Sequence, residues 1–319
     1  MNQIKNIGFG TAAIGRPHYI NIKQEAESHP FSLPRFREKG LQVLEDAYNM
    51  GVRFFDTSPG YGMAEELLLG WLKEKNDPSI TVSTKWGYTY LANFDPNAKQ
   101  HEVKEHSLSK LNEQWSFSIR LLPYLKVYQI HSATFSTGVL DNKDVLRHLH
   151  KLKIDHGVLI GLTTTGIDQV EVLKKALTVK VEGEQLFQSY QCTFNILDQS
   201  LIRQKEALSN IEGPFIIKEA LANGRLMPNT NYSNYSELYN FIISLAEKYN
   251  VGADAIALRY CIDNFSKAMV LSGANNSIHL KANLKADGFI LTQSEMEQLT
   301  AYGVSAEEYW QERKKLSWN

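Results

Sequence analysis

The chain has 319 residues, of which 43% are hydrophobic and 22% are charged, and its formal net charge is −1. This composition supplies a large apolar core and argues against disorder. It shows no basic footprint for nucleic acid or an anionic membrane. No apolar run approaches the roughly 18 residues of a membrane span. The N-terminus, MNQIKNIGFG, lacks the apolar stretch of a signal peptide, so we expect a cytoplasmic protein.

Cysteine and histidine spacing gives no sign of a metal centre. Cys192 and Cys261 lie far apart and form no CxxC pair, so we expect two buried, reduced thiols. Several histidines fall on helix-like or loop stretches, and we expect them at the surface: His101, His106, His148, His150 and His156.

Short apolar runs alternate with longer helical patterns along the chain. Runs such as VRFF and VYQI are typical of buried strands, because they are rich in β-branched and aromatic residues. The expected strands are Ile7–Thr11, Val52–Thr57, Ile80–Lys85, Lys126–His131, Val158–Thr163, Glu184–Gln191, Pro214–Lys218 and Ala268–Leu271. The expected helices are Phe36–Met50, Asn142–Ile154, Asp168–Leu177 (with Asp168 as N-cap), Ser236–Tyr249 and Asp254–Asp263.

This alternation predicts an α/β fold with a parallel sheet. Eight repeats of roughly 40 residues favour closure into a (β/α)8 TIM barrel, although an open doubly wound sheet would show the same alternation. Gly8, Gly10 and Gly15 have the spacing GxGxxxxG, which does not match the GxGxxG fingerprint of an open dinucleotide-binding sheet. No linker or change of composition divides the chain, so we expect one domain over residues 1–319.

Ionisable residues close three consecutive expected strands. Asp56 ends the second strand, Lys85 the third and His131 the fourth, and Tyr61 follows Asp56 on the next loop. Barrel enzymes hold their catalytic residues at these strand ends, and neighbouring strands lie about 4.8 Å apart. Each residue alone has an ordinary structural explanation, such as a turn aspartate or a buried histidine. A lysine that ends a buried parallel strand is costly unless it is paired, so their joint placement favours a site.

A coherent set of roles follows from this placement. Asp56 would pair with Lys85, and the Lys85 cation would lower the pKa of Tyr61 from its usual value near 10. Tyr61 would then exchange a proton with a carbonyl or alcohol oxygen, while His131 would orient the same oxygen. No side chain can supply a hydride, whereas a nicotinamide cofactor can.

These residues and their surroundings resemble the aldo-keto reductase superfamily. The similar stretches run from residue 7 to residue 284 in the family's order: IGFGTAAIG, FFDTSPGYGMAEELLLGWL, STKWG, YQIHS, IGLTTTG, QCTFNILD, IIKEALANGRL and LSGANNSIHLKANL. The resemblance implies a TIM barrel that interconverts an aldehyde, ketone or sugar and its alcohol. It gives Asp56, Tyr61, Lys85 and His131 the roles of the family's catalytic tetrad. We expect the family's N-terminal plug hairpin to be absent or reduced, because only six residues precede the first expected strand.

Two glycine-containing loops suit phosphate groups even without the resemblance. They follow the seventh and eighth strands, where barrels often bind phosphate, although ordinary turns would explain either loop equally well. The resemblance makes Glu219–Leu226 a pyrophosphate-binding stretch and Gly273–Asn283 an adenosine-binding stretch. It implies cofactor contacts from Gly10, Thr11, Thr163, Gln191, Lys218, Ala220, Leu221, Gly224, Leu226, Gly273, Ala274, Asn275, His279 and Asn283.

Some positions depart from the family pattern. Lys218 stands where many members have a tyrosine that stacks on the nicotinamide. It would contact a cofactor phosphate or Asp56, or would only change how the nicotinamide ring is held. Gly273 and His279 stand where members that bind the 2′-phosphate often have Lys or Arg, and Arg225 or Lys281 would substitute for them. We therefore expect NADP(H), with NAD(H) as the alternative.

Aromatic segments near the catalytic face suggest a pocket for a small carbonyl or sugar substrate. The long loop from Trp86 to Val103 begins with Trp86 and Tyr88, which we expect to line this pocket. The C-terminal residues Tyr309, Trp310 and Trp318 would line it too, or would pack on outer helices. The insertion Arg16–Pro34, with His18, Tyr19 and His29, would cover the substrate or contact a partner. The sequence does not indicate an oligomeric state.

Two other functions remain open from the residues alone. The first is a cofactor-binding regulatory protein with weak catalysis, against which the intact tetrad argues. The second is a Schiff-base lyase that uses Lys85 or Lys218, because barrels do place reactive lysines at strand ends.

Overall fold

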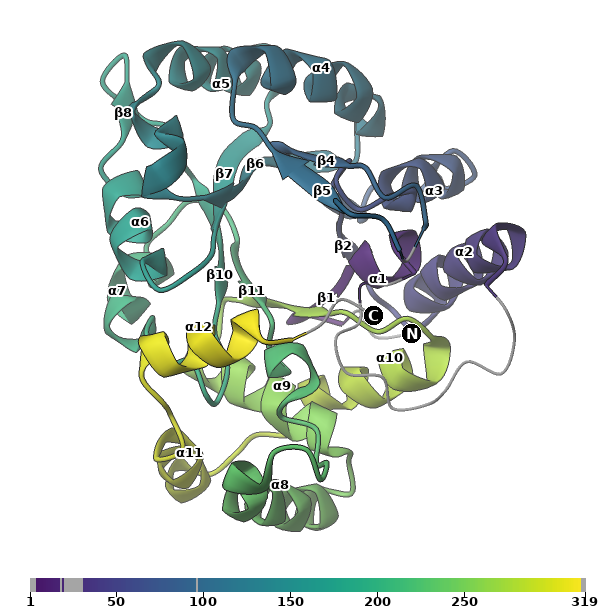
Figure 1. Cartoon of the computed structure of the whole chain (residues 1–319), viewed down its shortest axis with the longest axis vertical. Helices are drawn as coiled ribbons and strands as arrows, with labels where there is room; N and C mark the ends of the chain where they lie inside the picture. Colours follow the sequence, from purple (N-terminus) through teal and green to yellow (C-terminus); the bar gives the residue numbers. More distant parts are fainter. Residues whose placement is uncertain (1–3, 18, 20–30, 96, 317–319) are drawn as a thin grey trace.

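Eight parallel strands close into a barrel in the computed structural model, which describes residues 4–17, 19, 31–95 and 97–316 (Figure 1). The barrel strands, in spatial order, are β1 (Ile7–Gly10), β12 (Met269–Ser272), β11 (Phe215–Lys218), β10 (Ser189–Thr193), β7 (Leu159–Thr164), β6 (Leu125–Ala133), β3 (Thr81–Trp86) and β2 (Phe54–Asp56). The predicted TIM barrel is therefore confirmed. Among the described residues, the chain from Ile4 to the start of β1 contains no strand.

Helices surround the barrel and cover the outer faces of its strands (Figure 1). They are α1 (Ala12–Gly15), α2 (Leu33–Asn49), α3 (Ala64–Leu72), α4 (Leu108–Ser118), α5 (Lys143–His156), α6 (Gln169–Ala176), α7 (Lys205–Ser209), α8 (Ser236–Tyr249), α9 (Ala253–Asn264), α10 (Ser277–Leu284), α11 (Gln293–Thr300) and α12 (Ala306–Lys314). The five expected helices correspond to α2, α5, α6, α8 and α9. Asp168 is the N-cap residue of α6, as predicted, although its side chain makes no capping hydrogen bond.

Two small hairpins stand outside the barrel. β8 (Lys180–Val181) and β9 (Glu184–Gln185) pair antiparallel around Gly183, which has a φ of +86°. The expected strand Glu184–Gln191 is therefore wrong at its start, because its first two residues belong to this hairpin. β4 (Tyr88–Tyr90) and β5 (Glu102–Lys104) form the second hairpin, within the expected lid loop after β3.

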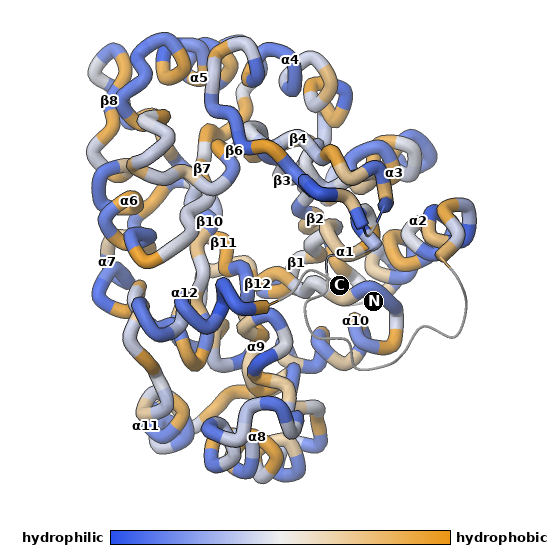
Figure 2. Tube along the Cα trace, in the orientation of Figure 1, coloured by the Kyte–Doolittle hydropathy of each residue, from blue (hydrophilic) through white to orange (hydrophobic). Residues whose placement is uncertain are grey.

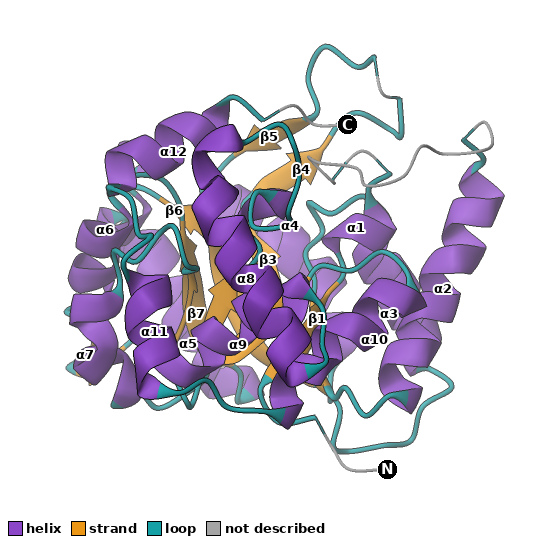
Figure 3. Ribbon diagram, turned by 90° about the horizontal axis from the view of Figure 1, so that it is seen from below, coloured by secondary structure: helices purple, strands orange, loops and turns teal. Residues whose placement is uncertain are grey.

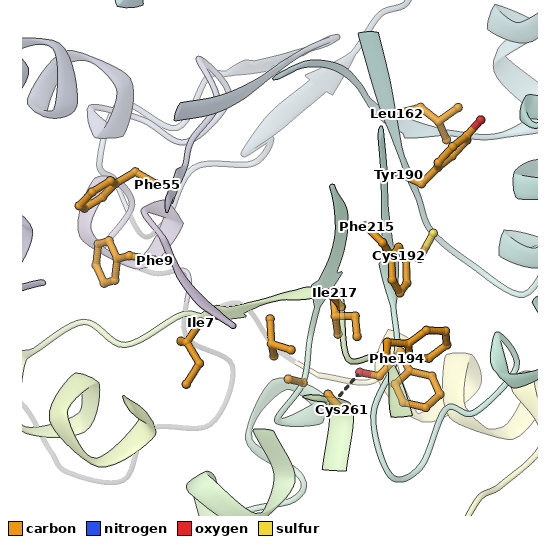
Figure 4. Close-up of a cluster of buried hydrophobic side chains, with 14 of the residues drawn as sticks. Ile7, Phe9, Phe55, Leu162, Tyr190, Cys192, Phe194, Phe215, Ile217 and Cys261 are labelled. Carbon is orange, nitrogen blue, oxygen red and sulfur yellow. Dashed lines mark hydrogen bonds between the residues drawn. The ribbon is translucent and has the colours of Figure 1, made fainter. Parts of the chain in front are cut away.

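The core lies between the barrel strands and the inner faces of the helices. Figure 2 shows the contrast between the largely apolar strands and the hydrophilic α12. Part of this core joins the end of β10 to α9, where the Phe194 and Phe265 rings meet with 4.9 Å between ring centres. Cys261 donates to the Phe194 carbonyl oxygen at 3.4 Å (Figure 4). Cys192 and Cys261 are both buried and unpaired, as predicted.

One end of the barrel carries the segments of interest. α1, α12 and the β4–β5 hairpin lie together at this end (Figure 3). The strand register places Asp56 of β2 between Gly10 of β1 and Ser83 of β3. Lys85 of β3 stands beside Gln129 of β6. The carboxyl ends of the first strands thus bring the predicted residues to one rim.

Candidate active site

A buried ion pair joins the ends of β2 and β3. The Asp56 and Lys85 side chains are 3% and 0% exposed, and the Lys85 ammonium contacts Asp56 Oδ1 directly. Lys85 Nζ also donates to the Thr57 carbonyl oxygen at 3.0 Å. Gln191 Nε2 donates to Asp56 Oδ2 at 2.9 Å. These partners offset the cost of burying two charges, and the predicted pairing is confirmed.

Tyr61 and His131 complete the cluster next to this pair. The Tyr61 hydroxyl lies 3.5 Å from His131 Nε2, and Lys85 Nζ lies 4.7 Å from the centre of the Tyr61 ring. Both residues are half-buried, so they retain a surface that a substrate can reach. The four residues predicted from the strand ends therefore lie together in the structure.

The electrostatics of Tyr61 differ from the prediction. Burial raises the pKa of Tyr61 well above its ordinary value, and the negative charges of Asp56 and Glu102 raise it further. The expected net lowering is wrong, because burial and these two carboxylates outweigh the nearby cations, of which Arg16 lowers the pKa of Tyr61. Because its pKa is raised, Tyr61 is a neutral phenol, which can donate a proton.

His131 is also neutral. Burial lowers its pKa well below the ordinary value, and the positive charges of Lys85 and Lys218 lower it further. Ser58 Oγ lies 3.4 Å from Nδ1, on the opposite side of the ring from the Tyr61 hydroxyl. A neutral imidazole in this position can exchange a hydrogen bond with an uncharged oxygen without adding a charge to the site.

The β4–β5 hairpin forms one wall of the site. The Tyr88 ring packs on His131 with 4.6 Å between ring centres, and Tyr88 is half-buried, so it still offers surface to a ligand. Glu102 pairs with Arg16 at 2.6 Å, which ties the hairpin to the segment after α1. Trp86 is fully buried, so its predicted place in the pocket lining is wrong: its ring packs at the edge of His106 instead.

The C-terminal helix α12 also reaches this rim. Tyr309 donates to Glu219 Oε2 at 3.1 Å, and Arg313 pairs with Glu219 at 3.4 Å. The Trp310 ring lies 6.0 Å from Lys218 Nζ. The tail therefore contacts the loop after β11 and is not confined to outer helices. His18, His29 and Trp318 lie outside the described residues. Tyr19 is described, and its ring lies 6.0 Å from that of Tyr61.

Lys218 makes a different contact from the one expected. Its Nζ donates to Thr193 Oγ1 at 2.9 Å, whereas the Asp56 oxygens bind Lys85 and Gln191. Burial lowers the pKa of Lys218 despite the neighbouring Glu219 carboxylate. Lys218 thus stands as a half-buried cation at the end of β11.

Several predicted cofactor residues already hold the framework of the site. Gln191 binds Asp56, and the Thr163 hydroxyl accepts the Ser132 N–H at 2.7 Å. Thr11 Oγ1 donates to the Asp56 carbonyl oxygen at 3.0 Å, which places Gly10 and Thr11 at the rim of β2.

The two predicted phosphate loops have backbones that suit an anion. Positive φ angles occur at Glu219, Ala222, Asn223 and Gly224, so the loop that also contains Ala220, Leu221 and Leu226 turns sharply. Gly273 is exposed, and a side chain added there would meet open space. Ala274 and Asn275 follow it, and Asn276 caps α10 by accepting the His279 N–H at 2.8 Å. The Asn283 amide is buried and bonds Ser272 Oγ at 2.8 Å. An open backbone before a capped helix fits a phosphate-bearing cofactor.

One proposed cation for the 2′-phosphate is excluded. Arg225 is fully buried and pairs with Glu312 at 2.7 Å, so it faces α12 and not a ligand. Arg35 and Lys39 of α2 instead line a hollow of about 340 Å³ with Asn276 and Ser277 at the start of α10. This hollow contains none of the four tetrad residues. Neither cation has an ion-pair partner within the described ranges.

Two histidines that were expected at the surface are buried. His106 and His150 are 8% and 7% exposed, so the expectation that they lie at the surface is wrong. The described residues contain no group of three His, Cys, Asp or Glu side chains that could hold a metal ion. In the same residues, no helix is long and apolar enough to cross a membrane.

The chain is similar to known proteins both in sequence and in fold. The aldo/keto reductase family profile matches residues 6–303. An aryl-alcohol dehydrogenase of Pestalotiopsis microspora is 22% identical over 282 residues, which cover 82% of this chain and 72% of that protein. A glycerol dehydrogenase of Gluconobacter oxydans superposes with a TM-score of 0.72 at 20% identity, covering 93% and 90% of the two chains. An aldo/keto reductase of Klebsiella pneumoniae in complex with NADP and acetate gives 0.66 at 16%, covering 93% and 90%. The chain belongs to the aldo/keto reductase family.

Proposed function

We propose that this protein interconverts a small aldehyde, ketone or sugar and its alcohol, with a nicotinamide cofactor as hydride carrier. The observation that carries the proposal is the convergence of the Tyr61 hydroxyl and His131 Nε2 beside a buried Asp56–Lys85 pair. Two neutral hydrogen-bonding groups 3.5 Å apart can both reach one substrate oxygen. When bound, the cofactor supplies the hydride that no side chain can provide.

In the reduction, Tyr61 donates its phenolic proton to the oxygen that becomes the alcohol. The raised pKa keeps that proton on Tyr61 until the oxygen gains negative charge. Lys85, 4.7 Å from the ring centre, then stabilises the phenolate that remains. Asp56 and the Thr57 carbonyl hold the Lys85 ammonium in place. His131 orients the substrate oxygen through Nε2.

We further propose NADP(H) as the preferred cofactor. The loops at Glu219–Leu226 and Gly273–Asn283 would hold its phosphates and adenosine, and Thr163 and Gln191 would face the nicotinamide amide. The exposed Arg35 and Lys39 beside the start of α10 support a site for the additional phosphate. The NADP in the Klebsiella pneumoniae structure is consistent with this preference.

The substrate would lie against Tyr88, Tyr61 and Tyr19. Aromatic faces and two neutral donors suit an uncharged carbonyl compound or a sugar, because both present C–H faces to an aromatic ring and an oxygen that accepts a hydrogen bond. The aryl-alcohol dehydrogenase and the glycerol dehydrogenase among the similar proteins act on alcohols, as their names state.

The lyase alternative has less support. Lys85 has no exposed surface and is ion-paired, so its amine is not available to form a Schiff base. Lys218 is half-buried with a lowered pKa, and it is the lysine that a lyase would have to use. Borohydride reduction in the presence of a carbonyl substrate would trap the protein covalently through Lys218. Trapping that is lost in Lys218→Ala would support the lyase and contradict our proposal.

Fluorescence titration with NADPH and NADH, followed by a panel of aldehydes, ketones and sugars, tests the proposed function. We expect tighter binding of NADPH and loss of absorbance at the reduced-nicotinamide band with at least one carbonyl. Cofactor binding without turnover of any compound would instead support the regulatory alternative.

A further inference from the structure

The end of β6 contains a bulge at His131. β6 and β7 pair at Ile130 with Leu162 and again at Ala133 with Thr164. Two residues of β6, His131 and Ser132, therefore stand opposite one residue of β7. Ser132 has a φ of +53°, in the left-handed region that β-strands avoid. A bulge of this kind changes the direction in which a side chain points.

The bulge removes two backbone groups from the strand ladder, and two side chains bind them. The Ser132 N–H donates to Thr163 Oγ1 at 2.7 Å. The His131 carbonyl oxygen lies 2.9 Å from His106 Nε2. Thr163 comes from β7, and His106 comes from the segment after the β4–β5 hairpin. The bulge is therefore held from both of its sides.

His106 is placed firmly enough to fix its partner. It is 8% exposed, and its ring lies at the edge of Trp86, 5.4 Å between ring centres. Gly87 has a φ of +110°, and a Cβ there would lie 2.3 Å from the His106 ring. The absence of a side chain at Gly87 thus makes the space that the ring occupies. Gln114 Oε1 accepts the Gly87 N–H at 2.7 Å and holds that turn.

The chemistry of His106 assigns the direction of its hydrogen bond. Burial lowers the pKa of His106 to about 4, with a further contribution from Lys104, so the ring is neutral and carries one N–H. A carbonyl oxygen only accepts, so that proton lies on Nε2. Nδ1, the acceptor of the neutral ring, is buried and has no partner among the described residues, so the Nε2 contact is the hydrogen bond that holds this ring.

We propose that His106 is a positioning residue for the reaction: its Nε2–H holds the His131 carbonyl, and thereby sets the direction in which the His131 imidazole meets the substrate oxygen. The inference rests on the proposed function, because it concerns the geometry of His131 in that reaction. A shift of about 1 Å in such a group can lower turnover on the order of 10²-fold.

Three variants test this role. His106→Phe keeps a ring against Trp86 but has no donor, and His106→Gln keeps an N–H in a similar position. His150→Phe is the matched control, because His150 is 7% exposed but lies on α5. We expect His106→Phe to lower kcat by about tenfold or more, with the NADPH Kd within about twofold. His106→Gln should recover most of the lost kcat, and the control should leave kcat unchanged.

Unchanged kcat in a folded His106→Phe would overturn the inference, and so would a His106→Gln enzyme as slow as His106→Phe. Long-range ¹H–¹⁵N correlation of the imidazoles in the unmodified protein gives a test that does not depend on variant folding. It should show His106 protonated on Nε2, and protonation on Nδ1 would overturn the proposal. Absence of turnover in the unmodified protein would overturn the proposed function itself, which is a distinct result.

Discussion

The buried Asp56–Lys85 pair allows a quantitative prediction from a double-mutant cycle. The two side chains are 3% and 0% exposed, so water cannot solvate a charge whose partner has been removed. Asp56→Asn would leave an unpaired ammonium, and Lys85→Met would leave an unpaired carboxylate. Each single substitution should lower the free energy of unfolding by roughly 3–5 kcal/mol. The double variant buries no charge, so it should cost less than either single one.

The coupling in this cycle should therefore be at least about 3 kcal/mol. Urea unfolding followed by circular dichroism measures it, with equal m values as the check that unfolding exposes similar surface. The matched control is the exposed pair Arg147–Asp144, whose side chains are 68% and 77% exposed. Its cycle should give a coupling below about 1 kcal/mol. Additive costs at Asp56 and Lys85 would refute the inference that their charges depend on each other.

Two further variants test charges elsewhere in the molecule. Burial raises the pKa of Glu65 to about 7 from the ordinary 4.5, although Ser118 and Thr84 donate hydrogen bonds to it. The folded protein therefore keeps a proton that the unfolded chain loses between these pH values, and stability should fall as pH rises from about 4.5 to about 7. Glu65→Gln should remove this component, roughly 3 kcal/mol at most, so urea midpoints that change equally with pH in both proteins would contradict the assignment. At the rim, Arg35→Ala combined with Lys39→Ala should raise the NADPH Kd about tenfold and leave the NADH Kd unchanged. Arg147→Ala combined with Lys151→Ala is the matched control, because both cations are 68% exposed on α5. Equal weakening of both cofactors in the Arg35→Ala and Lys39→Ala protein would argue against a phosphate contact.

The barrel could be predicted from the sequence because strand and helix patterns alternate without interruption. The tetrad could be predicted because a parallel barrel brings strand ends to one rim, which fixes the neighbours of Asp56, Lys85 and His131. The start of β10 could not, because Glu184 and Gln185 follow a Gly183 turn whose hairpin depends on a positive φ angle.

Other features depend on three-dimensional contacts that spacing does not reveal. The sign of the pKa change at Tyr61 reflects burial together with Asp56 and Glu102, and Glu102 lies 41 residues away on β5. His106 has no motif of its own, since only the bulge at Ser132 brings its ring to the His131 carbonyl. Arg225 follows a predicted phosphate loop but turns toward Glu312 of α12. The sequence does show a glycine at position 87, but its positive φ and the space that it leaves for the His106 ring appear only in the structure.

The central claim is that Tyr61 gives the proton that accompanies hydride transfer. Single-turnover mixing of the NADPH-bound protein with a carbonyl substrate measures this step directly through the reduced-nicotinamide absorbance. Tyr61→Phe keeps the ring near Lys85 and removes only the hydroxyl, so the NADPH Kd should stay within about twofold while the rate falls by about 10²-fold or more. A Tyr61→Phe protein that oxidises NADPH at the native rate would contradict the account, because the proton would then have to come from another group.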